Sequence, residues 1–260
     1  MSAHNRIAEI KNNGYYIDFG DIFNRSFENY KKIALTAGLV FILLGFVFMA
    51  LMVGIMGIFW GFSTFSEEMA GLNIENIPAY AIVIYVIAVV VISGIVAPIN
   101  AGIIKMAYNA ANNLDFSIGT AFEYYKTSYF TELFTATALI SFLSVVINTA
   151  IEMAGIPLLG ALFSYVIAFF TFLTIPLIIF GNLKAVEAIK ASVMIVSKQF
   201  LILLGLLLVS VIMAGLGIFG FCIGIFFTVP FIFSVYYCVY DEVVGAGHKS
   251  ELDEIGSSVE

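Results

Sequence analysis

Charged side chains are scarce in this sequence of 260 residues. Asp, Glu, Lys and Arg make up 11% of it, whereas 62% of the residues are hydrophobic and 26 are phenylalanines. Soluble domains average about 25% charged and about 45–50% apolar residues. So little charge cannot cover a surface that faces water on all sides. The composition therefore excludes an ordinary soluble domain and indicates an integral membrane protein.

Residues that commonly carry chemistry are also few. The two cysteines, Cys222 and Cys238, lie near opposite ends of one apolar run, which favours neither a disulfide nor a metal pair. The two histidines, His4 and His248, lie in polar termini, and no aspartate falls inside a long apolar run. Hydrolysis within a bilayer needs a nucleophile and its base, paired aspartates or metal ligands. We therefore expect no enzymatic activity, no cofactor and no metal site.

No cleavable signal peptide is recognisable, because the first 30 residues are polar and lack an apolar core. Long apolar runs follow, and a bilayer is crossed by about 20 apolar residues in a helix. The runs predict an all-α polytopic protein with a single transmembrane domain, 1–240, and a disordered acidic tail, 241–260. The six expected transmembrane helices are 33–60, 79–104, 133–153, 157–180, 200–217 and 219–240.

The basic residues test this assignment, because a wrong number of spans would scatter them over both sides. All 11 fall on one side, and the opposite connections carry only Glu67, Glu68, Glu75 and Glu152. The positive-inside rule then predicts a multi-pass protein of the bacterial cytoplasmic (inner) membrane with both termini in the cytoplasm. The residues that carry the prediction are Arg6, Lys11, Arg25, Lys31, Lys32, Lys105, Lys126, Lys184, Lys190, Lys198 and Lys249.

A pattern recurs three times on the cytoplasmic side. Segments 21–32, 117–130 and 183–200 each have apolar residues at helical spacing and predict amphipathic helices at the interface, the third with its apolar face at Val186, Ile189, Val193 and Val196 and with Asn182 as a candidate N-cap. Each is followed by two spans, the second of which contains a proline. The pattern predicts a threefold hairpin repeat with units of about 18–112, 113–182 and 183–240.

Seven residues are candidates for a helix kink or a cavity lining. They are the three prolines of the repeat and the polar residues near mid-span: Pro98, Asn100, Asn148, Thr174, Pro176, Thr228 and Pro230. A proline in a membrane helix is tolerated where neighbouring groups satisfy the carbonyl it leaves free. The two asparagines have two interpretations. They either form interhelical hydrogen bonds, worth about 0.6 kcal/mol each, or line a pathway.

The third unit also contains motifs that resemble those of known proteins. It contains A-x-x-A-S around Ala188 and Ser192, an aromatic Phe200, the turn GIFGFCIG, and TVP before a tyrosine-rich end. With these motifs the chain resembles a broad group of bacterial six-helix integral membrane proteins. It is similar to the membrane domain attached to some glycerophosphoryl diester phosphodiesterases. The resemblance implies the six-helix architecture, but the catalytic domain is absent and its activity does not carry over.

Three functions are compatible with these observations. The first is a non-enzymatic membrane component or assembly partner in the bacterial envelope. The second is a transporter or channel for a small apolar or amphipathic solute, with a cavity bounded by Pro98, Asn100, Pro176 and Pro230. The third, from the resemblance, is an accessory membrane domain for a lipid-processing enzyme.

The expected partners are the lipid bilayer and either a membrane protein or a second copy of the chain, with no nucleic acid. Pairs of small residues at four-residue spacing allow close helix packing. We expect that packing to lie within the chain rather than between copies. The pairs are Ala50 and Gly54, Gly57 and Gly61, and Gly220 and Gly224.

Overall fold

The computed structural model describes residues 3–59, 78–220 and 223–245, with the side chains of 55–59 and 79 outside this description. These residues form helices and no strand. The α-helices are α1 (Ala3–Asn13), α2 (Phe19–Phe59), α4 (Ala79–Ala111), α5 (Tyr129–Met153), α6 (Pro157–Thr171), α7 (Thr174–Ile179), α8 (Ala185–Lys198), α9 (Phe200–Gly215), α10 (Gly224–Thr228) and α11 (Pro230–Tyr240). Two 3₁₀-helices, η2 (Ile118–Lys126) and η3 (Leu216–Phe219), and a π-helix, η4 (Asp241–Gly245), complete the fold.

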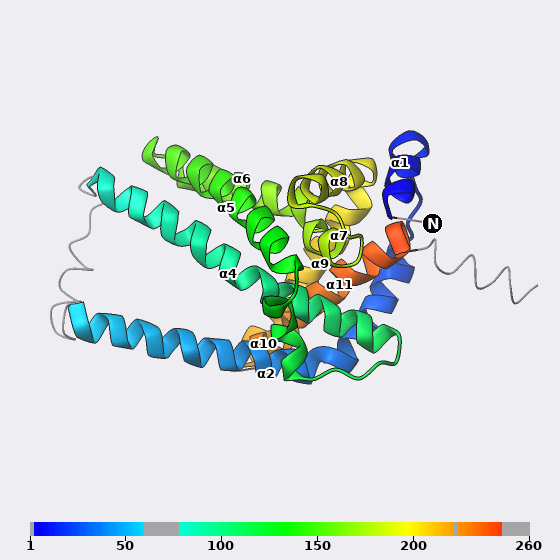
Figure 1. The fold of residues 1–260 in the computed structure, drawn as a ribbon, viewed down its shortest axis with the longest axis horizontal. Helices are drawn as coiled ribbons and strands as arrows, with labels where there is room; N and C mark the ends of the chain where they lie inside the picture. Colours follow the sequence, from blue (N-terminus) through cyan, green and yellow to red (C-terminus); the bar gives the residue numbers. More distant parts are fainter. Residues whose placement is uncertain (1–2, 60–77, 221–222, 246–260) are drawn as a thin grey trace, which may run out of the picture.

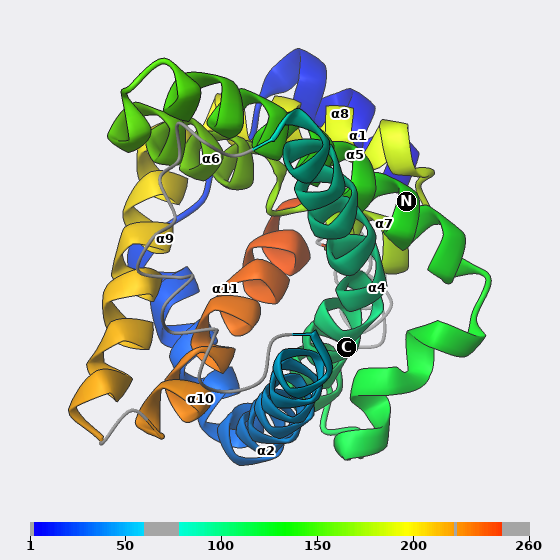
Figure 2. The same ribbon diagram turned by 90° about the vertical axis from the view of Figure 1, so that its left-hand side faces the viewer.

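Six helical stretches within the described residues are long and apolar enough to cross a membrane: Phe19–Gly54, Tyr80–Ala111, Tyr129–Met153, Pro157–Ile179, Phe200–Phe219 and Gly224–Gly245. The predicted all-α, six-span architecture is confirmed. The helices form an open ring when viewed along α2 and α4, with α11 on its inner side (Figures 1 and 2). The charged N-terminal part of α2 and the end of α11 meet at the same end of the molecule (Figure 1).

The amphipathic segment 21–32 is not a separate helix, because it is the beginning of α2. With 41 residues, α2 is about 60 Å long, twice the thickness of a bilayer core. Its first turns run across the direction of the rest of the helix in both views (Figures 1 and 2). The predicted helix over 21–32 is therefore present, but it continues into the first span without interruption.

The other two amphipathic segments differ in detail from the prediction. η2 is a 3₁₀-helix with a Ser117 and Thr120 capping box. α8 is an α-helix, but its buried face is formed by Ala185, Ala188, Ser192 and Ile195, whereas Val186 and Val193 are exposed. Small residues lie on the buried face because α8 packs closely against α6 and α7. The two valines of the predicted apolar face thus lie on the side of α8 that the described chain leaves uncovered, which is compatible with the predicted interfacial helix.

The N-terminal end of α8 is capped from a different helix than expected. The Ala185 amide donates a hydrogen bond of 2.7 Å to the carboxylate of Glu132 on α5. Asn182 has a φ of 55° and accepts a hydrogen bond from the Tyr129 hydroxyl instead. The prediction of Asn182 as N-cap is wrong, because a carboxylate from α5 takes that role.

The polar N-terminal segment contains a helix that the sequence patterns did not reveal. α1 lies against α8 and η4, with Ile10 buried, and Ile17 is buried just after it. The Tyr15 hydroxyl donates to the Ile195 carbonyl at 3.1 Å, and the Gln199 amide donates to the Tyr15 carbonyl at 2.6 Å. Burial raises the pKa of Tyr15 above its ordinary value, which keeps this hydroxyl a donor.

The predicted acidic tail begins five residues too early. Residues 241–245 continue α11 as the π-helix η4, with Val243 and Val244 buried. Arg6 on α1 donates to the Val243 carbonyl at 3.1 Å, which holds this turn in place. The remaining tail, 246–260, lies outside the described residues.

Candidate functional site: a polar network joining α2, α4 and α11

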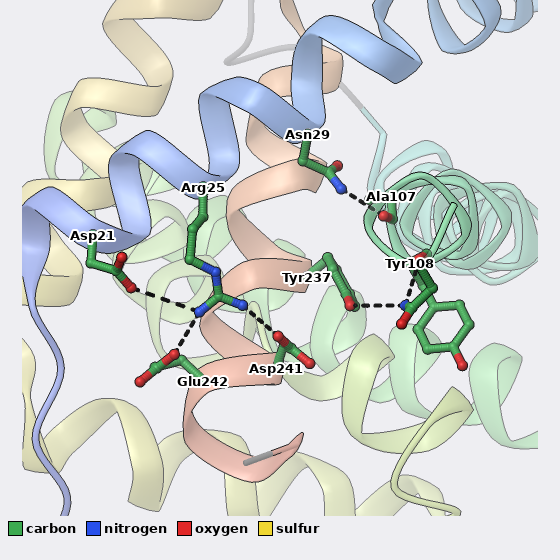
Figure 3. A network of polar contacts seen from close by, with 9 residues as sticks. Asp21, Arg25, Asn29, Ala107, Tyr108, Tyr237, Asp241 and Glu242 are labelled. Atoms are coloured by element: carbon green, nitrogen blue, oxygen red, sulfur yellow. Dashed lines mark hydrogen bonds and ion pairs between the residues drawn. The ribbon is translucent and has the colours of Figure 1, made fainter. Parts of the chain in front are cut away.

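Arg25 is the centre of an ionic cluster between α2 and the end of α11. Its guanidinium donates to the carboxylates of Asp241 and Glu242, each at 2.5 Å, and lies 3.8 Å from Asp21 one turn earlier (Figure 3). The side chains of Arg25, Asp241 and Glu242 are only partly exposed, whereas Asp21 is more than half exposed. Planar guanidinium nitrogens match two carboxylates at once, and charge-assisted bonds of this kind are stronger than neutral ones. The cluster joins positions more than 200 residues apart.

One turn further along α2, a buried amide connects three helices. Asn29 is 5% exposed, and its amide nitrogen donates to the Ala107 carbonyl of α4 at 2.7 Å. Its carbonyl oxygen accepts from the hydroxyl of Ser234 on α11 at 3.1 Å. Both ends of the amide are therefore paired, as a buried polar group requires.

The C-terminal end of α4 is closed by the same region. Lys32 donates to the Ala110 carbonyl at 3.0 Å, and the Asn112 side chain donates to the Tyr108 carbonyl at 2.8 Å. Asn112 also reaches the hydroxyl of Tyr237 on α11 at 3.5 Å (Figure 3). The last carbonyls of a helix have no partner within it, and side-chain donors satisfy them here.

Between these groups lies a cleft of about 400 Å³. Its lining is polar and balanced in charge, with two cationic and two anionic side chains. The lining residues are Asn24, Arg25, Glu28, Asn29, Lys32, Ala111, Asn112, Tyr237, Cys238 and Asp241. Since Arg25, Asn29, Lys32 and Asn112 already have partners within the chain, the cleft is chiefly the surface of a structural joint.

None of the seven residues predicted for a kink or cavity lines this cleft. Pro98, Pro176, Pro230 and Thr174 are buried, and Asn100, Asn148 and Thr228 are partly buried. The helix is interrupted between α6 and α7 before Pro176, and between α10 and α11 at Pro230, but α4 continues through Pro98.

Two of these polar residues bridge the helices of a hairpin. The Thr228 hydroxyl donates to the Ala214 carbonyl of α9 at 2.6 Å, and so connects α10 to α9. Asn148 of α5 lies directly against Gly160 of α6, where a Cβ would be 2.7 Å from the side-chain amide oxygen of Asn148. The structure thus places Thr228 and Asn148 in helix packing.

Sequence reasoning missed Asn29, Ser234 and the partners of Arg25. The predicted tail, 241–260, includes Asp241 and Glu242, and the amphipathic pattern of segment 21–32 indicates no partner for Arg25. Asn29 lies in the segment FENYKK, whose polar neighbours give no local signal of its burial. Its partner Ala107 is 78 positions away, and no local pattern identifies it.

Comparisons with known proteins find no matching family model, no matching curated protein and no matching solved structure. Among the described residues, no group of three or more His, Cys, Asp or Glu side chains could hold a metal ion. The site is defined by its own geometry, which is that of a clamp between the beginning and the end of the transmembrane domain.

Proposed function

We propose that this multi-pass protein is a non-enzymatic component of a bacterial inner membrane that assembles with another membrane protein. One observation carries the proposal: several polar side chains near and within the spans are engaged in contacts between its own helices. Arg25, Asn29, Ser192 and Thr228 all bond to other elements of the chain. Apolar surface is what remains available for interaction.

The outward surface of α5 is the part of that surface best suited to a partner helix. Leu139, Phe142, Leu143 and Val146 follow the i, i+3, i+4, i+7 spacing of a single helix face, and all four are exposed. In membranes, helices associate chiefly by van der Waals packing along such a face. This face supports assembly rather than solute passage, since Pro98, Pro176 and Pro230 are buried.

A photo-crosslinking amino acid at Phe142 tests the proposal in intact membranes. We expect one cross-linked species of defined mass, and the same substitution at Leu201, an exposed residue of α9, serves as the matched control. The mass distinguishes a partner from a second copy of the chain. Equal labelling at both positions, or adducts with lipid alone at Phe142, would contradict assembly through α5.

The proposed orientation places both termini in the cytoplasm, supported by the one-sided distribution of basic residues. Lys126 and Ile156 are exposed and flank α5, which spans about 37 Å between them. In a background without Cys222 and Cys238, a membrane-impermeant thiol reagent outside intact cells should label Ile156→Cys and not Lys126→Cys. The reverse result would overturn the orientation.

A further inference from the structure

Among the residues that the structure describes, one stretch of α2 in its second half is uncovered on every side. Residues Phe46 to Gly54 are nine consecutive positions, and each of them is exposed. Nine residues make about two and a half helical turns, so the exposed positions include the side that faces the other helices. A helix at the outer surface of a bundle would instead alternate between covered and uncovered faces.

One face of the beginning of α4, which follows α2 in the ring, is uncovered, whereas Ala81, Ile82 and Val86 between the exposed positions are partly buried. Tyr80, Val83, Ile84, Tyr85 and Ile87 are all exposed, and the first fully buried position of α4 is Gly94, which lies against the ring of Phe134. The two helices are joined near Asn29 and Ala107 and diverge toward their other ends in both views (Figures 1 and 2). The described parts of the chain therefore do not fill the space between them.

The chemistry of this space restricts what can enter it. No charged side chain occurs between Ile33 and Gly54 or between Tyr80 and Ile104. The hydroxyl of Ser93 donates to the Val89 carbonyl of its own helix at 2.7 Å. Beyond the hydroxyls of Tyr80 and Tyr85 near the beginning of α4, a polar occupant would lose its hydrogen bonds to water and find few partners here, at a cost of several kcal/mol per group. The occupant must be hydrocarbon.

We propose that acyl chains of bilayer phospholipid enter between α2 and α4 and form part of the interior of the folded protein. A partner helix would cover one stripe of α2, about 100° wide, and would leave the other sides uncovered. Flexible acyl chains conform to all sides at once. In the proposed orientation, they belong to the leaflet opposite the basic end of the molecule.

Ala50 and Gly54 agree with this assignment. Their spacing was expected to mark helix packing within the chain, but Ala50 is exposed and a Cβ at Gly54 would meet no atom within 4 Å. Gly224, in contrast, lies against Gly217, where a Cβ would be 2.5 Å from the Gly217 carbonyl oxygen. Gly217 of η3 and Gly224 of α10 are used for packing, and Ala50 and Gly54 of α2 are not.

Tryptophan scanning tests this inference in the purified full-length protein, one copy per nanodisc of phosphatidylcholine with or without bromine at mid-chain. With Trp60→Phe as the background, single tryptophans replace Val47, Phe48, Met49 and Ala50. These positions are about 100° apart around the helix. We expect all four to lose a similar share of their fluorescence in brominated lipid, because bromine quenches only on contact.

A tryptophan at Phe231, which is 1% exposed, should retain its fluorescence and is the control for a covered site. Protection of any of the four scanned positions would overturn the proposal, because a protein segment would then cover that side of α2. Cysteine pairs give a second measurement that needs no bulky residue. Rapid disulfide formation between Phe48→Cys and Ile84→Cys would show that the helices close against each other, and would equally overturn it.

Discussion

Gly102→Val in α4 is expected to lower the stability of the protein strongly. A Cβ at Gly102 would lie 2.4 Å from the carbonyl oxygen of Ala121 and 2.5 Å from its Cα. Real contacts at such distances do not occur, and the obstructing atoms are backbone rather than a flexible side chain. The valine side chain therefore forces η2 away from α4.

Overpacking of a well-filled site costs about 1–3 kcal/mol, and we expect about 3 kcal/mol or more for this change. In detergent this corresponds to an apparent melting temperature lower by on the order of 10 °C. The measurement is the fraction of protein that remains monodisperse in size-exclusion chromatography after heating. Because the displaced element is η2, increased proteolysis between residues 112 and 128 should accompany the loss.

Gly54→Val is the matched control. The residue type and the substitution are the same, but a Cβ at Gly54 meets nothing within 4 Å. Valine has a slightly higher helix propensity than glycine, by about a few tenths of a kcal/mol, and this small difference applies to both variants. A melting temperature for Gly102→Val that equals that of Gly54→Val would disprove the close contact of α4 with η2.

Much of this architecture could be predicted from the sequence, because span length and apolarity are local properties. An apolar run longer than a bilayer core must cross it or be buried, and the number and approximate positions of the six spans follow. The division of the run 200–240 at Gly217 and Gly220 could be predicted for the same reason: η3 ends there, and Gly217 allows the close approach of Gly224.

The features that could not be predicted depend on contacts between distant residues. α1 carries only a few apolar positions among polar ones, and its burial depends on the surface of α8. The separation of α2 from α4 is invisible in a sequence, since an apolar helix face looks the same whether lipid or protein covers it. Pro98 is a case in which a local sequence rule fails: proline commonly interrupts helices, but α4 continues through Pro98.

The Arg25 cluster yields the second large expected effect, through Arg25→Gln. This change removes two charge-assisted bonds and leaves the carboxylates of Asp241 and Glu242 close together without the cation between them. Hydrogen bonds to charged groups contribute about 1.5–3 kcal/mol, and part of that is lost to solvent because the cluster is partly exposed. We expect a loss of about 1–3 kcal/mol, measured by the same heating assay, with α11 released from the start of α2.

Lys31→Gln is the control for loss of a positive charge from the same helix. Lys31 pairs with Glu28 at 2.6 Å, but both side chains are more than half exposed. Exposed pairs of this kind contribute about 0–1 kcal/mol. A loss of stability for Lys31→Gln as large as that for Arg25→Gln would attribute the effect to net charge rather than to the clamp.

A double-mutant cycle separates the clamp from the general role of either side chain. If Arg25 and Glu242 act through their bond, the variant with both Arg25→Gln and Glu242→Gln should lose less stability than the sum of the two single variants. The coupling should persist at high salt better than that of Lys31 and Glu28, since partly buried pairs are screened less. Additive losses would show that Arg25 and Glu242 stabilise the protein independently, and the junction of α2 with α11 would then depend on Asn29 and Ser234.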